Sequence, residues 1–214
     1  MNSKYVCLLL TIIGFSFQLR AQERAVTSTG EEVILFDDGT WKYMDVDLPT
    51  VDEIKTNPRN FTKPKESSFL LKSKKTNNGF WINPKLWDFR KGTDNPDAEY
   101  ELQLKEGDLY GMIITEKVEI PLESLKNIAL DNAKSVAPDI RLVMEEYRTV
   151  NGLKVLCLQL NGTTQGIKFS YFGYYFSNES GTVQFITYTA QSLIEENRNT
   201  AENLLNGIVL LNQE

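Results

Sequence analysis

The sequence predicts an α+β protein: a mainly antiparallel β-sheet with helices on both faces, an α/β/α sandwich, preceded by an N-terminal β-hairpin. Short turns such as Asn151-Gly152 join most of the β-prone runs, and these residues accept the positive φ of a tight hairpin. The run "LKVLCLQL" (153–160) is apolar on both alternating faces, as in a strand covered on both sides. Two segments change to a helical period and supply the cover.

The N-terminus, "MNSKYVCLLLTIIGFSFQLRAQ", has the form of a secretory signal peptide. Lys4 precedes an apolar run from Tyr5 to Phe17, and Ala21 completes a cleavage signal. The run is shorter than the roughly 20 apolar residues of a membrane span. We therefore predict that residues 1–21 are removed on export to the periplasm or the exterior, with membrane contact only before cleavage. An uncleaved anchor is the alternative.

The composition restricts the partners. The chain has 214 residues and a net charge of −6, which becomes −8 without residues 1–21, since these contain Lys4 and Arg20 and no acid. An acidic protein is poorly suited to nucleic acid or anionic lipid. Cys157 is the one cysteine left after cleavage, so no internal disulfide is predicted. Its place between leucines predicts a buried small hydrophobe.

The mature chain divides into three parts. Residues 22–45 contain two β-prone runs around Asp38-Gly39, which predicts a hairpin that pairs Val33 and Leu35 with residues 41–43. Residues 46–66 are polar and proline-rich, which predicts a linker. The remaining residues, 67–214, form the predicted domain.

Within the domain, strands come first, then a helix, more strands and a last helix. The predicted strands are 68–73, 79–82, 100–104, 109–118, 140–150, 153–160, 167–176 and 182–189. The first helix lies between Pro121, which suits its first turn, and Pro138, which stops it. Its apolar face comprises Leu122, Leu125, Ile128, Ala129, Ala133 and Val136.

The C-terminal segment also has a helical period. Its predicted apolar face comprises Leu204, Leu205, Ile208 and Leu211. Asn199 and Glu202 have the spacing of a capping box, which would start the helix at that point.

The segment "WINPKLW" (81–87) resembles the apolar-x-Pro-x-x-Trp motif of the Mog1/PsbP-like superfamily, particularly its DcrB-like secreted bacterial members. The order of strands and helices over residues 67–211 is similar too. The resemblance implies an α/β/α sandwich. It also implies a binding or accessory protein without catalytic residues, although members serve varied partners and the fold alone does not transfer a function.

The stretch "FSYFGYYFSNESGTVQFITYT" (169–189) is rich in aromatic residues. One face of its first strand, with Tyr171 and Tyr175, is apolar throughout and predicts core. The other face begins polar and ends in Phe172, Tyr174 and Phe176. These three are the candidate contact residues for a ligand or partner, against the alternative that they too are buried.

Several chemistries are excluded or disfavoured. The chain has no histidine, which removes His-dependent nucleophile sites and His-ligated zinc. Glu145 and Glu146 are neighbours on a strand and point to opposite faces, so they do not form a glycosidase pair. Glu195 and Glu196 are predicted to face solvent. We predict no enzyme, no cofactor and no metal site.

Two acidic loops leave a cation site open as an alternative. The first offers Asp45, Asp47, Asp52 and Glu53, and the second offers Asp94, Asp97 and Glu99. Carboxylate oxygens are ligands that calcium prefers, but neither loop has the EF-hand pattern.

Together these features predict an exported, non-catalytic binding or accessory protein of the bacterial cell envelope. The alternative is a carrier of a small ligand or cation, with a pocket beside the aromatic hairpin.

Overall fold

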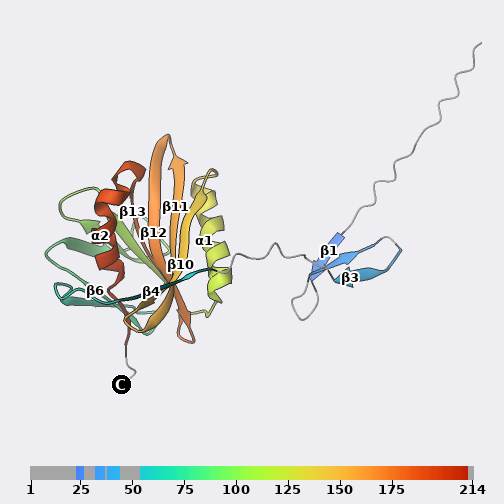
Figure 1. Ribbon diagram of the computed structural model, residues 1–214, viewed down its shortest axis with the longest axis horizontal. Coiled ribbons are helices and arrows are strands. Elements are labelled where there is room, and N and C mark those ends of the chain that lie inside the picture. The colour runs from blue at the N-terminus through green and yellow to red at the C-terminus, as the bar shows by residue number, and fades with distance from the viewer. Residues whose placement is uncertain (1–22, 27–31, 37, 44–53, 212–214) are drawn as a thin grey trace, which may run out of the picture. The chain divides into compact units, whose positions relative to one another are not determined.

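The computed structural model describes residues 23–26, 32–36, 38–43 and 54–211, and the chain divides into two units between residues 53 and 54 (Figure 1). The predicted signal peptide, residues 1–21, lies outside the described residues, as do residues 46–53 of the predicted linker. Among the described residues, no helix is long and apolar enough to cross a membrane.

The first unit contains the predicted hairpin. Strands β2 (Glu32–Leu35) and β3 (Trp41–Tyr43) pair antiparallel, with Val33 opposite Tyr43 and Leu35 opposite Trp41, which confirms the predicted pairing of these residues. Gly39 adopts a φ of 78° in the turn, the conformation that favours glycine. A third strand, β1 (Glu23–Val26), pairs with β2 and was not predicted.

The second unit is built on an eight-stranded sheet with the order β4-β10-β11-β12-β13-β9-β8-β7. Its pairs are antiparallel except for β4 with β10, so the prediction of a mainly antiparallel sheet is confirmed. The strands are β4 (Thr56–Phe61), β7 (Trp87–Lys91), β8 (Ala98–Leu104), β9 (Tyr110–Glu116), β10 (Arg141–Val150), β11 (Leu153–Thr164), β12 (Ile167–Asn178) and β13 (Gly181–Ala190).

A smaller sheet has the order β14-β6-β5 and consists of β5 (Phe69–Lys72), β6 (Asn78–Ile82) and β14 (Ile208–Leu210). Helix α1 (Leu122–Val136) ends where predicted, next to Pro138. Helix α2 (Ile194–Leu205) follows a short 3-10 turn, Gln191–Leu193.

The core consists of two clusters that meet at β11, which is buried on both alternating faces as predicted. Val155 and Cys157 belong to a cluster that includes Leu204 and Leu205 of α2. Leu156 and Leu158 belong to a cluster that includes Leu125 of α1. Cys157 is fully buried, which confirms its prediction as a core residue.

The prediction that residues 46–66 form a linker is wrong for the second half of this segment. Residues 56–61 form β4, the edge strand beside β10, and the Tyr147 amide donates to the Lys55 carbonyl at 2.9 Å. Only Phe61 of this strand is buried, so its sequence is as polar as a loop. Its proline is tolerated because it lies on a sheet edge.

The predicted end of the last helix is also wrong. Helix α2 stops at Leu205, and Ile208 pairs with Phe80 in β14 instead of continuing the helical face. Gly207 permits this because its backbone lies against Trp81, where a Cβ would be 2.0 Å from the carbonyl oxygen. The predicted capping box is absent from this helix start, since Asn199 and Glu202 lie inside α2.

Candidate functional site

The three sequence-predicted contact residues lie in the core. Phe172 and Tyr174 are fully buried and Phe176 is 6% exposed, all within the cluster beneath α2. None presents a surface to a ligand or partner, so the prediction of a contact site on this face is wrong. The physical reason is that Leu204 and Leu205 of α2 fill the space over this part of β12.

Tyr174 belongs to a buried polar network around Arg148. The Arg148 guanidinium donates to the Tyr174 hydroxyl at 2.9 Å and to Glu202 Oε1 at 2.8 Å, and it also pairs with Glu146. Burial by itself lowers the pKa of Arg148, but the neighbouring acidic groups outweigh it and the pKa is raised. Arg148 thus stays charged and links β10 to α2. We assign this network to stability.

The opposite face of β12 carries a row of half-exposed rings. Tyr110 of β9 stacks on Tyr188 of β13 with centroids 5.4 Å apart, and Tyr188 meets Tyr171 of β12 at 6.0 Å. Burial raises the pKa of Tyr171 and, together with nearby Glu101, that of Tyr188. An aromatic surface therefore exists beside the β12–β13 hairpin. It is formed by Tyr110, Tyr171 and Tyr188 and not by the predicted contact residues.

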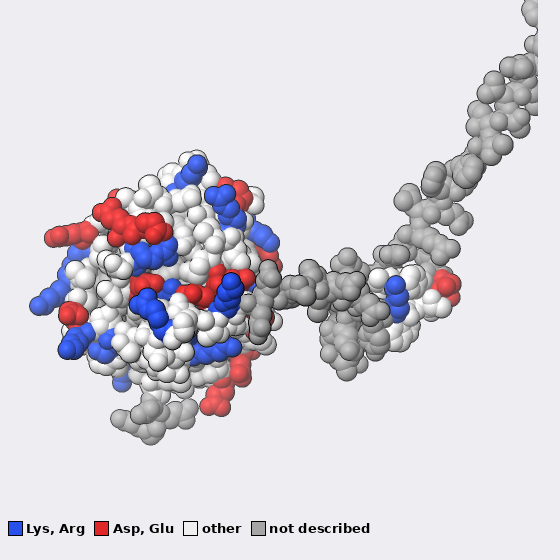
Figure 2. All heavy atoms as spheres, in the orientation of Figure 1, with Lys and Arg blue, Asp and Glu red and all other residues white. Residues whose placement is uncertain are grey.

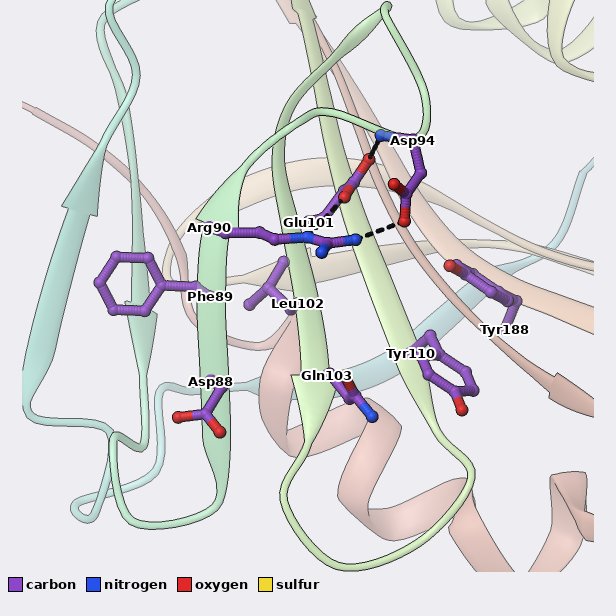
Figure 3. A pocket seen from close by; sticks show the side chains of 9 residues that line it. All are labelled: Asp88, Phe89, Arg90, Asp94, Glu101, Leu102, Gln103, Tyr110 and Tyr188. Atoms are coloured by element: carbon purple, nitrogen blue, oxygen red, sulfur yellow. Dashed lines mark hydrogen bonds and ion pairs between the residues drawn. The ribbon is translucent and has the colours of Figure 1, made fainter.

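At one end of this row lies a pocket of about 510 Å³, which we call the Arg90 pocket (Figure 3). Strands β7, β8 and β9 form its floor. Arg90 reaches across the floor to Glu101 and Asp94, while Phe89 points away toward β5. Tyr110 and Tyr188 lie side by side at the opposite wall. The pocket combines aromatic faces with groups of both charges.

Glu101 organises the loop at the rim of this pocket. Its Oε1 accepts three backbone N–H bonds, from Thr93 at 3.1 Å, Asp94 at 2.8 Å and Asn95 at 2.9 Å, and its Oε2 accepts from Arg90 Nε at 2.9 Å. These hydrogen bonds hold the pKa of Glu101 below its usual range. The bond from the Asn95 amide has the largest effect, and the other two amides and Arg90 add to it. The carboxylate is therefore saturated with donors.

This arrangement bears on the acidic loop that was a candidate cation site. Asp94 pairs with Arg90, whereas Glu99 lies on the other side of β8 and accepts from Ser73, Lys74 and Thr115. The loop therefore does not bring its three acids together. The part of the chain that the structure describes holds no group of three metal-ligating side chains. The other acidic loop, residues 45–53, lies outside it.

A second pocket, of about 400 Å³, adjoins the same loop, and we call it the Tyr175 pocket. Its floor is formed by β9, β12 and β13, one wall by the C-terminal half of α1, and the other by residues 94–97. Tyr175 and Gln184 lie at its base, where burial raises the pKa of the Tyr175 hydroxyl. The face that the sequence predicted as plain core is therefore hollow at this point.

The structure confirms the predicted orientation of Glu145 and Glu146. Glu145 pairs with Lys126 of α1, whereas Glu146 pairs with Arg148 under α2, so they point to opposite faces. Glu195 pairs with Arg198 at the surface. Burial raises the pKa of the Cys157 thiol to about 12, so it is not a nucleophile at neutral pH.

The comparisons with known proteins bear on the fold. No protein-family model matches the chain, and no curated protein matches its sequence significantly. Among solved structures, the solution structure of cyanobacterial PsbP (CyanoP) from Synechocystis sp. PCC 6803 is similar, with a TM-score of 0.53 and 12% identity, covering 69% of this chain and 94% of that one. The chain has a PsbP-like fold. This confirms the predicted resemblance to the Mog1/PsbP-like superfamily at the level of fold.

Two further solved structures were found at lower similarity. PA94 from Pseudomonas aeruginosa, a protein of unknown function, has a TM-score of 0.42 and 10% identity, covering 68% of this chain and 97% of its own. LpqN from Mycobacterium tuberculosis, involved in cell envelope biogenesis, has a TM-score of 0.38 and 8% identity, covering 71% and 82%. Similarity at this level carries no argument about this chain.

Proposed function

We propose that the protein is a non-catalytic accessory protein of the bacterial cell envelope, exported by residues 1–21, and that it acts by binding a protein partner. The observation that carries the proposal is the open end of the sheet at the Arg90 pocket. There Asp88, Arg90 and Gln103 are exposed beside the half-buried Tyr110 and Tyr188. Tyrosine and arginine at a surface that is otherwise uncovered are typical of protein interfaces.

The remaining features agree with a binding role. The absence of histidine removes the commonest acid–base and nucleophile chemistry. Helix α1 packs on β11 and β12 and does not extend over the Arg90 pocket, whose floor is formed by β7, β8 and β9. Figure 2 shows acidic and basic side chains interspersed over the face in view. That distribution and the negative net charge favour a protein partner over a nucleic acid.

Site-specific crosslinking tests this proposal. A photoreactive phenylalanine derivative replaces Gln103 in the full chain, which is expressed and irradiated in its own cells. We expect one crosslinked envelope protein. The same derivative at Asp131, on the exposed side of α1 and outside both pockets, should give none. Crosslinks of equal strength from both positions, or none from Gln103, would show that the open end of the sheet is not the contact surface.

Cell fractionation tests the location. The processed chain should be found in the periplasmic or extracellular fraction. Recovery of an unprocessed chain from the membrane fraction would contradict export by a cleaved signal.

The alternative function, carriage of a small ligand or cation, is favoured by one observation, the Tyr175 pocket. A hollow beside the aromatic strand is the feature that distinguishes a carrier from a purely partner-binding module.

A further inference from the structure

Two polar side chains at the base of the Tyr175 pocket have no hydrogen-bond partner among the residues that the structure describes. Tyr175 is 2% exposed and Gln184 is 8% exposed, and they stand directly opposite each other on β12 and β13. Neither forms a hydrogen bond with any residue that the structure describes. Leaving a buried hydroxyl or amide unpaired is unfavourable, and nearly all such groups in native proteins are satisfied.

Both groups open into the pocket. Thr76 and Asn78 also carry unpaired polar atoms, but those atoms are completely enclosed. The polar atoms of Tyr175 and Gln184 are not among the enclosed ones, and both residues line the hollow. Their missing partners are therefore expected to come from the contents of the pocket.

The side chains that flank these two groups on the sheet and face them from α1 are apolar, whereas polar residues of the lining, Asn95, Asn132 and Ser135, come from the loop and from α1. Met112, Ile114 and Ile186 flank them on the sheet, and Ala129 and Ala133 face them from α1. The two alanines are too short to fill the gap between helix and sheet, which leaves the hollow. Its volume of about 400 Å³ is within the range of small-molecule pockets.

The charges around the pocket exclude an anion. Among the described residues, no lysine or arginine lines it, and the charged residues at its rim are Asp94 and Asp97. Asp94 is already paired with Arg90. A buried charge without a counter-charge is strongly unfavourable, so an uncharged occupant is favoured.

We propose that the Tyr175 pocket binds a small uncharged molecule with an apolar body and one carbonyl or hydroxyl group. The body packs between α1 and the sheet, and the polar group bonds to the Tyr175 hydroxyl and the Gln184 amide. The inference rests on the carrier alternative above and is independent of the partner surface at the Arg90 pocket.

The test uses prodan, an uncharged naphthalene ketone whose emission shifts to the blue in apolar sites, and the mature chain, residues 22–214. We expect saturable binding with one site per chain. Tyr175→Phe and Gln184→Met should each weaken binding about tenfold, the loss that corresponds to one hydrogen bond of about 1.4 kcal/mol. Ala133→Leu should abolish binding by filling the hollow. Lys134→Leu, which adds the same side chain at the adjacent exposed position, should not change it.

Thermal unfolding separates a binding role from a structural one. Since the Tyr175 hydroxyl has no partner in the part of the chain that the structure describes, Tyr175→Phe should leave the unfolding midpoint unchanged or raised while binding falls. If Ala133→Leu does not fold, the Tyr175 and Gln184 variants still decide the question.

Three results would overturn the proposal. They are no saturable prodan binding to the mature chain, binding that is unaffected by the Tyr175 and Gln184 changes, and equally tight binding of the anionic dye anilinonaphthalene sulfonate with the same sensitivity to these changes. The first would indicate that the pocket holds only water. Crosslinking from Gln103 in the Tyr175→Phe variant reports on the partner surface separately, so either proposal can fail alone.

Discussion

Replacing Glu101 by glutamine should destabilise the protein by about 1–2 kcal/mol at neutral pH. The glutamine side chain retains a carbonyl oxygen for the amides of Thr93, Asp94 and Asn95 but loses the negative charge. Hydrogen bonds to a charged group contribute about 1.5–3 kcal/mol, against about 0.5–1.5 kcal/mol for neutral ones. Three such differences, of about 1–1.5 kcal/mol each, give an upper limit of roughly 4.5 kcal/mol. Because the loop is exposed, solvent screens the charge and reduces this limit to the expected loss of about 1–2 kcal/mol.

The effect should depend on pH. The folded-state pKa of Glu101 is below its ordinary value of 4.5, so the carboxylate contributes its full stability above that value. The contribution is lost as the pH falls through the lower, folded-state pKa. Because the glutamine of the variant does not titrate, the difference between wild type and variant should be constant from neutral pH to about 5 and should shrink below about 4.5.

Urea unfolding at a series of pH values measures this difference. Glu106→Gln, at an exposed glutamate in the turn after β8, is the matched control and should have no measurable effect. Equal effects of the two changes, or a Glu101 effect that persists unchanged to about pH 3, would refute the assignment of Glu101 as the organiser of the loop.

Three further outcomes are expected. Cys157 should react with a thiol reagent far more slowly in the native than in the unfolded protein, and Cys157→Ser should cost on the order of 1–3 kcal/mol of unfolding free energy, because the site is sealed; rapid native labelling would contradict burial. Arg148→Ala should lower the free energy of unfolding in urea by about 3–5 kcal/mol, because it leaves the largely buried carboxylates of Glu146 and Glu202 without their counter-charge. A loss under about 1 kcal/mol would contradict the assignment of this network to stability. N-terminal sequencing of the exported chain should find Gln22 as the first residue. Limited proteolysis should release a fragment that retains β4. A stable fragment starting near Ser67 would contradict the pairing of β4 with β10.

Much of the fold could be predicted because the local sequence signals, such as turn residues and prolines, agree with the positions of these residues in the folded structure. The Asn151-Gly152 turn takes positive φ at both residues, 49° and 84°, as its composition requires. Helix α1 occupies the interval between its two prolines. Strands β10 to β13 follow one another through short turns, so their order in the sheet is their order in the chain.

The errors share a physical cause, which is that edge elements bury few side chains. Strands β4 and β7 expose most of their residues, so neither shows an apolar period long enough to be read. Strand β14 is three residues long and follows a helix, so Ile208 continues the helical spacing by chance. Only the close approach of Gly207 to Trp81, which the sequence does not reveal, ends the helix before it.

The site was misplaced for a different reason. Both faces of β12 are aromatic, so alternation divides its residues into two sets but does not say which set is fully covered. That depends on the helices: α2 presents Leu204 and Leu205 over Tyr174, while α1 presents Ala129 and Ala133 toward Tyr175. The alanines were visible in the sequence as the small members of an otherwise bulky helical face. A helix that packs alanines against tyrosines and a glutamine leaves space above polar atoms, and that pattern, rather than the density of aromatic residues, leads to the pocket that we propose as a ligand site.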